Sequence, residues 1–220
     1  MKVENITKIY RTKTSEIKAL DNISYEFIPG KMYAIMGHSG SGKSTLISIL
    51  GLIDTYTSGK ISIENKDVSK LKENELADLR MKHIGFVFQD FYLDEHLKAY
   101  ENIILPMLIN KEIKKENRKE KALKLLKELG LEERINHYPG EMSGGECQRV
   151  AIARSLANDP QIILADEPTG NLDEENEKLV FSILKDLSKQ GKCVIVVTHS
   201  EEIKNYADEI LTISKGKLEG

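Results

Sequence analysis

Short apolar runs recur along the chain, with polar or helix-patterned segments between them. The clearest are MYAIMG (32–37), HIGFVFQ (83–89), QIILAD (161–166), CVIVVTH (193–199) and EILTIS (209–214). Apolar runs of this length are typical of strands that are buried on both faces of a sheet. Because helical segments alternate with the later runs, the pattern predicts an α/β fold with a mainly parallel sheet and covered faces.

The N-terminal part has a different pattern. MKVENITKIY (1–10) alternates polar and apolar residues, and NISYEFIPG (22–30) and GKISIEN (59–65) are further candidate strands, with the polar stretch RTKTSEIK (11–18) after the first. KSTLISILGLI (43–53) has helical spacing. We therefore expect a strand-rich beginning that leads into one helix.

Residues from about 90 to 160 are mostly helix-patterned. KEIKKENRKEKALKLLKELG (111–130) places Ala122, Leu125, Leu126 and Leu129 on one face. MSGGECQRVAIARSLAND (142–159) begins at a good N-cap residue, Ser143, with Glu146 three positions later as in a capping box. Its apolar positions are Val150, Ile152, Ala153, Leu156 and Ala157. We expect one domain over 1–220, with a core of about 1–88 and 161–220 and a helical subdomain inserted at about 89–160.

Composition narrows the possible functions. The chain has 220 residues and a net charge of −3, whereas a nucleic-acid-binding protein is more often clearly basic. Only Cys147 and Cys193 are present, which favours a reducing compartment over a disulfide framework. No apolar run is long enough to cross a bilayer, and the first residues do not resemble a signal peptide. We expect a cytoplasmic protein without a nucleic-acid partner, whose membrane role, if any, comes through another protein.

The stretch GHSGSGKST comprises Gly37, His38, Ser39, Gly40, Ser41, Gly42, Lys43, Ser44 and Thr45. It matches G-x-x-x-x-G-K-[ST] and lies between a predicted strand and a predicted helix, as a phosphate-binding loop requires. The backbone N–H groups would surround phosphate oxygens, Lys43 would approach the β- and γ-phosphates, and Ser44 would ligate Mg²⁺. The alternative is a Gly/Ser-rich turn that caps a helix. Binding of a nucleoside triphosphate is the stronger interpretation.

Two carboxylates follow the strand in IILADEP (162–168). Beside a phosphate loop, Asp166 is expected to hold Mg²⁺, directly or through water. Glu167, one residue later, is placed to act as a general base on an attacking water. The alternative is that both acids cap the helix after Pro168.

Other candidates end apolar strands, and the carboxyl ends of parallel strands meet around a ligand. His199 could contact the γ-phosphate, and Gln89 could reach Mg²⁺ or the attacking water. Tyr10 could stack on adenine. Read one at a time, a capping histidine, a polar strand end and a packed tyrosine are the simpler interpretations. Gly144 and Gly145 expose backbone N–H groups in a first helical turn, which favours an anion there as well.

Together these motifs resemble the nucleotide-binding domain of ATP-binding cassette (ABC) transporters, over essentially the whole chain. GHSGSGKST is similar to Walker A, Gln89 to the Q-loop glutamine and MSGGE (142–146) to the family signature. IILADE is similar to Walker B, NLD (171–173) to the D-loop and His199 to the switch histidine. The resemblance implies a P-loop NTPase fold with an N-terminal antiparallel β subdomain. It also implies Mg²⁺-dependent ATP hydrolysis with catalytic roles for Lys43, Gln89, Glu167 and His199.

In this family two cassettes face each other head to tail. The resemblance implies a homodimer formed on ATP binding, in which Ser143, Gly144, Gly145 and Glu146 adjoin the γ-phosphate held by the other subunit. It places Ser44, Gln89 and Asp166 at the metal and Tyr10 at the adenine. Glu146 departs from the usual Gln and Met142 from the usual Leu. The capping-box interpretation directs Glu146 back to the backbone of Ser143, away from phosphate.

ADEPTGNLD (165–173), GFVFQ (85–89) and ENIILPML (101–108) look most like the branch typified by MacB, LolD and FtsE. That resemblance implies a transmembrane permease partner with an extracytoplasmic domain and a location on the cytoplasmic face of the membrane. The permease would dock near residues 90–100, where Phe91, Tyr92, Leu93 and Leu97 either line a groove or pack internally. The cargo could be a peptide, an antibiotic or a lipoprotein, or the task could be mechanotransmission. The alternative function is a soluble ABC ATPase without a membrane partner.

Overall fold

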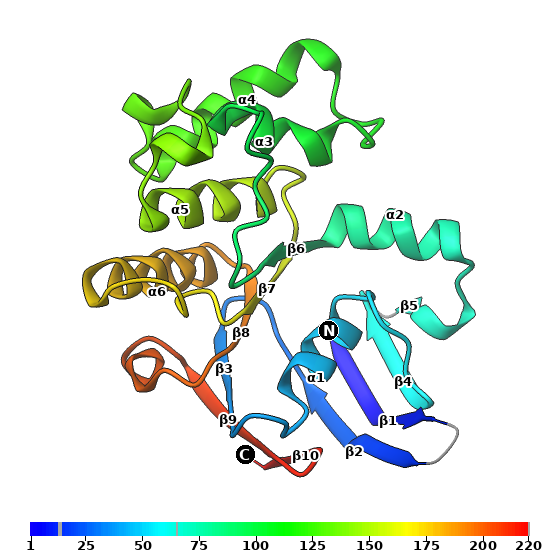
Figure 1. Cartoon of the computed structure of the whole chain (residues 1–220). Coiled ribbons are helices and arrows are strands. Elements are labelled where there is room, and N and C mark those ends of the chain that lie inside the picture. Colours follow the sequence, from blue (N-terminus) through cyan, green and yellow to red (C-terminus); the bar gives the residue numbers. More distant parts are fainter. Residues whose placement is uncertain (13–14, 65, 220) are drawn as a thin grey trace.

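The structure is a computed structural model that describes residues 1–12, 15–64 and 66–219. Its centre is a six-stranded sheet in the order β10-β9-β3-β8-β7-β6 (Figure 1). These strands are β3 (Met32–Met36), β6 (Ile84–Val87), β7 (Ile162–Asp166), β8 (Cys193–Val197), β9 (Glu209–Ser214) and β10 (Lys217–Glu219). All neighbouring pairs are parallel except β9 with β10. The predicted α/β fold with a mainly parallel sheet is confirmed.

A second sheet is antiparallel and has the order β2-β1-β4-β5. It consists of β1 (Lys2–Arg11), β2 (Glu16–Glu26), β4 (Ser58–Ile63) and β5 (Lys66–Asp67). β2 begins within the stretch expected to be a polar connection and ends before the predicted boundary at residue 30. Pairing across the hairpin, Tyr10 with Ile17 and Arg11 with Glu16, extends the strand into polar sequence. Residues 13 and 14 of that connection lie outside the described part of the chain.

The helices are α1 (Lys43–Leu50), α2 (Glu73–His83), α3 (Ala99–Ile104), α4 (Lys115–Glu128), α5 (Gly144–Ser155) and α6 (Glu174–Lys189). Short 3₁₀ turns cover Val68–Lys70, Leu105–Met107, Glu132–Arg134, Pro139–Glu141 and Glu201–Asn205. Helices α3, α4 and α5 group together beyond one end of the sheet (Figure 1). Helix α2 and strand β10 were not predicted. Helix α2 buries only Leu79, so its sequence has no apolar stripe, and β10 has three residues of which Lys217 and Glu219 are exposed.

Both faces of the parallel sheet are buried, and alternate residues of each strand enter different cores. On β3, Ala34 packs in one core with α3, α4, α5 and α6, and Tyr33 and Ile35 pack in the other with α1 and the antiparallel sheet. This two-sided burial is the reason that the strands read as continuous apolar runs. The predicted face of α4 is buried at Ala122, Leu125 and Leu126, with Leu129 partly buried. The five apolar positions predicted for the next helix are all buried, but α5 ends at Ser155, so Leu156 and Ala157 follow the helix. The helical residues share one core with the sheet, and the boundary between subdomains stays a prediction.

Candidate nucleotide site and the family of the chain

A cavity of about 740 Å³ opens where β3 ends and α1 begins. Most of the predicted phosphate loop lines it, together with the predicted catalytic pair. The lining residues are Ile17, Lys18, Ala19, Gly37, His38, Ser39, Gly40, Gly42, Lys43, Ser44, Thr45, Glu167, His199, Lys215 and Gly216. Its volume is within the range of small-molecule sites, about 300–1,000 Å³.

The phosphate loop is held close to the antiparallel sheet, and its lysine lies inside it. Gly42 has φ 111°, and a Cβ there would come within 2.6 Å of the Ala19 carbonyl oxygen, so only glycine fits. Lys43 is buried, and its Nζ donates to the carbonyl oxygens of Gly37 at 2.7 Å and His38 at 3.1 Å. The loop therefore holds one buried ammonium against its own backbone carbonyls, at the wall of the cavity.

Asp166, at the end of β7, brings a partly buried carboxyl group to the site. Its Oδ1 is buried and has no hydrogen-bond partner among the described residues. Burial raises the pKa of this carboxyl, the neighbouring Glu167 raises it further and Lys43 opposes the rise. A buried carboxylate oxygen without a partner beside a phosphate loop is a site suited to a cation.

Glu167 and His199 come from different strands and meet at the cavity. Glu167 follows β7 with φ 46°, a left-handed conformation that is rare for a non-glycine residue and common at functional sites. Its N–H donates to the Val197 carbonyl at 2.8 Å. The side chain Oε2 accepts the backbone N–H of His199 at 3.2 Å and lies 3.0 Å from His199 Nδ1. The predicted pair is thus brought into direct contact.

Gln89 instead lies against the segment that follows β7. Its Nε2 donates to Asn171 Oδ1 at 3.4 Å, and the side chain packs where a Cβ on Gly170 would be. Asn171 Nδ2 returns a long bond to the Gln89 carbonyl at 3.5 Å. The Q-loop and D-loop candidates therefore touch each other, and Gln89 is not among the residues that line the cavity.

Tyr10 lies on β1 next to the cavity but does not line it. Its hydroxyl donates to Asp54 Oδ2 at 2.8 Å, and the Lys8 ammonium lies 4.7 Å from the ring centroid. The ring is 41% exposed, and its cross-strand neighbour Ile17 lines the cavity. The tyrosine thus borders the phosphate loop's cavity on its strand side.

The N-terminus of α5 is a second candidate anion-binding site, separate from the phosphate loop. The predicted capping box is confirmed, because Ser143 Oγ accepts the Glu146 N–H at 3.2 Å and Glu146 Oε2 accepts the Ser143 N–H at 2.8 Å. The first-turn N–H groups of Gly144 and Gly145 have no partner within the helix ladder. None of Ser143, Gly144, Gly145 and Glu146 lines the phosphate-loop cavity.

Sequence reasoning missed part of the cavity wall. Ile17, Lys18 and Ala19 come from β2, and Lys215 and Gly216 come from the turn between β9 and β10. The contact is fixed by the backbone, since Gly216 N–H donates to the Ser41 carbonyl at 2.9 Å and Asp21 N–H donates to the Gly216 carbonyl at 2.8 Å. These segments are almost 200 residues apart and carry no motif, so no signal in one sequence could have found them.

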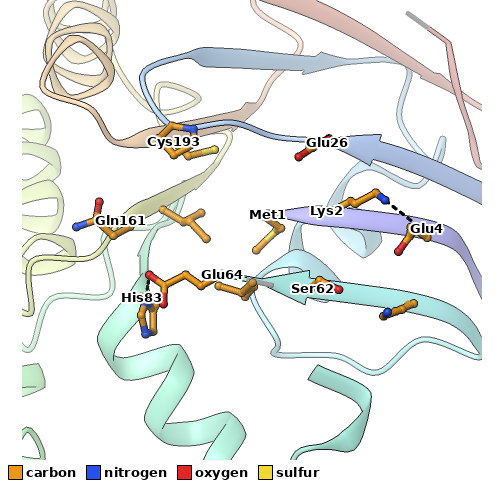
Figure 2. A pocket seen from close by; sticks show the side chains of 13 residues that line it. Met1, Lys2, Glu4, Glu26, Ser62, Glu64, His83, Gln161 and Cys193 are labelled. Carbon is orange, nitrogen blue, oxygen red and sulfur yellow. Dashed lines mark ion pairs between the residues drawn. The ribbon is translucent and has the colours of Figure 1, made fainter. Parts of the chain in front are cut away.

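Another cavity, of about 590 Å³, lies at the opposite edge of the sheet (Figure 2). Gln161 precedes β7 and Cys193 begins β8, so this cavity is at the amino ends of the strands, beside the first residues of β1. In Figure 2 His83 and Glu64 face each other, and their ion pair is 3.4 Å long. Ligands of open parallel sheets bind at the carboxyl ends of strands. The residues of the nucleotide motifs line the cavity at that end, so the cavity in Figure 2 is not the candidate nucleotide site.

The family follows from comparison with known proteins. A family model described as ABC transporter matches residues 20–170. MJ1508, an uncharacterised ABC transporter ATP-binding protein of Methanocaldococcus jannaschii, is 46% identical over 99% of this chain and 97% of its own length. The chain belongs to the ABC transporter family. Its cassette is also 46% identical to the macrolide export ATP-binding/permease protein MacB of Chlorobaculum tepidum, over 98% of this chain but about a third (33%) of that protein.

Solved structures agree with this assignment. The dimeric MJ0796 ABC transporter cassette matches all of this chain and 96% of its own with a TM-score of 0.90 at 42% identity. A dimeric post-hydrolysis state of the same cassette, bound to ADP and Pi, matches with a TM-score of 0.89 at 41% identity. The chain is accordingly an ATP-binding cassette that hydrolyses ATP. No helix of the described chain is long and apolar enough to cross a membrane.

Proposed function

We propose that two copies of this ABC cassette close head to tail around two ATP molecules and thereby drive a membrane permease. The observation that carries the proposal is the presence of two anion-binding ends that do not share a cavity. One is the phosphate loop, and the other is the start of α5. A two-fold pair would join each loop to the partner's α5, giving two composite sites. Loss of the γ-phosphate on hydrolysis would remove the bridge and let the pair open.

Within each site, catalysis is proposed to depend mainly on positioning and charge. Glu167 activates the attacking water, and the contact with His199 orients its carboxylate. His199, held beside Glu167 through Nδ1, donates a hydrogen bond to the γ-phosphate. Lys43 leaves the two loop carbonyls that it now contacts and neutralises the β- and γ-phosphates. Tyr10 stacks on the adenine, and Gln89 moves from Asn171 toward the reacting water.

Mg²⁺ fits the residues at the end of β7 and the start of α1. Asp166 offers a buried carboxylate oxygen that has no hydrogen-bond partner in the described chain, and Ser44 offers a hydroxyl. Mg²⁺ keeps several waters and needs few protein ligands, so Asp166 and Ser44 suffice to hold it, and Gln89 would join them after leaving Asn171. When bound, the ion would neutralise charge on the β- and γ-phosphates.

The permease is proposed to dock in a groove of about 620 Å³ that Phe86, Phe88, Tyr92 and Ile109 line. Phe86 and Phe88 stack at 4.3 Å, and Tyr92 meets Phe88 edge-on at 5.3 Å. Tyr92 is 66% exposed and Ile109 is 70% exposed, which is unusual for apolar side chains gathered in one place. Of the four residues predicted for this role, Tyr92 lines the groove, whereas Phe91, Leu93 and Leu97 do not. Leu93 packs instead against the core that contains α3, α4, α5 and α6.

The same proposal extends to the partner and the location. The MacB relative carries a permease in its own chain, as its name states, and we propose that a permease with an extracytoplasmic domain holds this cassette at the cytoplasmic face of the membrane. The cargo class is a peptide, an antibiotic or a lipoprotein, or the complex transmits motion. A soluble ABC ATPase is the alternative function. If the chain is a soluble ABC ATPase, Tyr92→Ala should leave its distribution between membrane and cytosol unchanged. If it docks on a permease through this groove, Tyr92→Ala should shift the protein to the cytosol.

The solution mass of Glu167→Gln, with and without MgATP, tests the composite site. Removing the base while keeping the side-chain shape should trap ATP, so a monomer that becomes a dimer only with MgATP is expected. Lys43→Ala combined with Glu167→Gln is the control, which should stay monomeric because it lacks the phosphate contact. A Glu167→Gln protein that binds ATP and remains a monomer would overturn the head-to-tail proposal for the isolated cassette.

A further inference from the structure

A carboxylate stands where the cassette is expected to receive a phosphate. Glu146 is in the first turn of α5, three residues after Ser143, and its side chain is 18% exposed. An acidic residue in this turn favours the helix itself, since it interacts well with the helix dipole. The same negative charge opposes the approach of a second anion. If the partner's γ-phosphate docks at this turn, the charge of Glu146 has to be neutralised.

Both oxygens of the Glu146 carboxylate are engaged. Oε2 accepts the backbone N–H of Ser143 at 2.8 Å, which closes the capping box. Oε1 accepts Nε–H of Arg134 at 2.8 Å, forming an ion pair between the 3₁₀ turn Glu132–Arg134 and α5. The Ser143 N–H and then Arg134 lower the pKa of Glu146, while burial opposes the shift, so the residue is charged at neutral pH. Glu146 therefore repels an approaching phosphate unless a cation neutralises the carboxylate.

Arg134 is suited to this balancing role. Its side chain is 36% exposed and donates to the oxygen that faces away from the cap. A charge-assisted bond of this kind holds the carboxylate in one position as well as balancing it. Arg149, on the next turn of α5, also interacts electrostatically with Glu146, although no hydrogen bond to it is seen in the described chain.

We propose that Arg134 is a positioning residue for ATP-driven closure, which holds Glu146 in the cap of α5 and cancels its charge so that this helix end can accept the partner's γ-phosphate. The inference rests on the proposed head-to-tail dimer. It explains how a cassette with Glu at this position of the signature keeps an anion-binding end. It also makes Arg134 necessary only because Glu146 is present.

The test measures dimer formation by sedimentation as MgATP is titrated into Glu167→Gln protein. Adding Arg134→Gln should raise the MgATP concentration for half-dimerisation roughly tenfold, the size expected for one unbalanced charge near a partly desolvated phosphate. Adding Glu146→Gln to that variant should restore most of the loss, and Arg134→Lys should lose less than Arg134→Gln. Lys124→Gln is the charge-matched control, because Lys124 pairs with Glu128 on the exposed side of α4, at 3.8 Å, and it should have no effect.

Binding of a fluorescent ATP analogue to the monomer should be unchanged in Arg134→Gln, since Arg134 does not line the phosphate-loop cavity. If Arg134→Gln dimerises at the parent's MgATP concentration, the inference is wrong although the dimer stands. If the Glu146→Gln addition rescues nothing, Arg134 has only a structural role and the inference is equally wrong. A parent that stays monomeric with ATP bound would overturn the proposed dimer and the inference together.

Discussion

Gly144 and Gly145 are neighbours in the first turn of α5, yet alanine should have opposite effects at the two positions. A Cβ on Gly145 would overlap the side-chain amide of Asn176 in α6. A Cβ on Gly144 would meet Leu172, Phe91 and the Asn171 carbonyl at ordinary distances of 3.6–3.9 Å. The contact with a second helix, and not the helix turn itself, distinguishes the two glycines.

The cost at Gly145 follows from what holds Asn176 in place. Its Nδ2 donates to both carboxylate oxygens of Asp173, at 2.9 and 3.0 Å. An alanine at 145 would force this amide aside, and losing two such bonds costs about 1–2 kcal/mol. Alanine is favoured over glycine in helices by up to about 1 kcal/mol, and this gain is common to both positions. Gly145→Ala should therefore be less stable than Gly144→Ala by about 1–2 kcal/mol.

Urea denaturation of both variants and the parent measures this difference, provided the slope with urea is unchanged. Gly144→Ala should be at least as stable as the parent. Adding Asn176→Ala should remove the obstacle, so that the same Gly145→Ala change no longer destabilises in that background. Equal stability of the two single variants would refute the argument that the helix contact, and not backbone freedom, requires glycine at 145.

Three further predictions concern the site and the core. Lys43→Ala should abolish binding of ATP in a calorimetric titration, because it removes the cation inside the phosphate loop; unchanged affinity would refute that role. Asp166→Asn should raise the melting temperature of the nucleotide-free protein at pH 7, since burial raises the pKa of Asp166 and its ionisation favours unfolding; the gain should vanish as the pH falls below the ordinary aspartate pKa, where both states are protonated. Cys193, whose thiol pKa burial raises to about 11, should react with iodoacetamide at pH 8 only after unfolding, and rapid labelling of native protein would contradict the packing.

Much of the fold could be predicted from periodicity alone. The buried strands β3, β7 and β8 read as apolar runs because both of their faces are covered, and α5 could be placed from its N-cap and apolar spacing. The phosphate loop could also be found, because its function depends on a fixed spacing of glycines and one lysine within nine consecutive residues. Such features are local, so the sequence by itself determines them.

Contacts between distant segments were decided only by the tertiary structure. The Glu167–His199 contact depends on β7 and β8 being neighbours in the sheet. The ion pair between Arg134 and Glu146 depends on how the turn after α4 packs on α5. Lys18 and Lys215 reach the nucleotide cavity although no motif contains them. Burial and the balance of charges depend on how these distant segments are arranged in space. The order of neighbouring residues along the chain does not specify that arrangement.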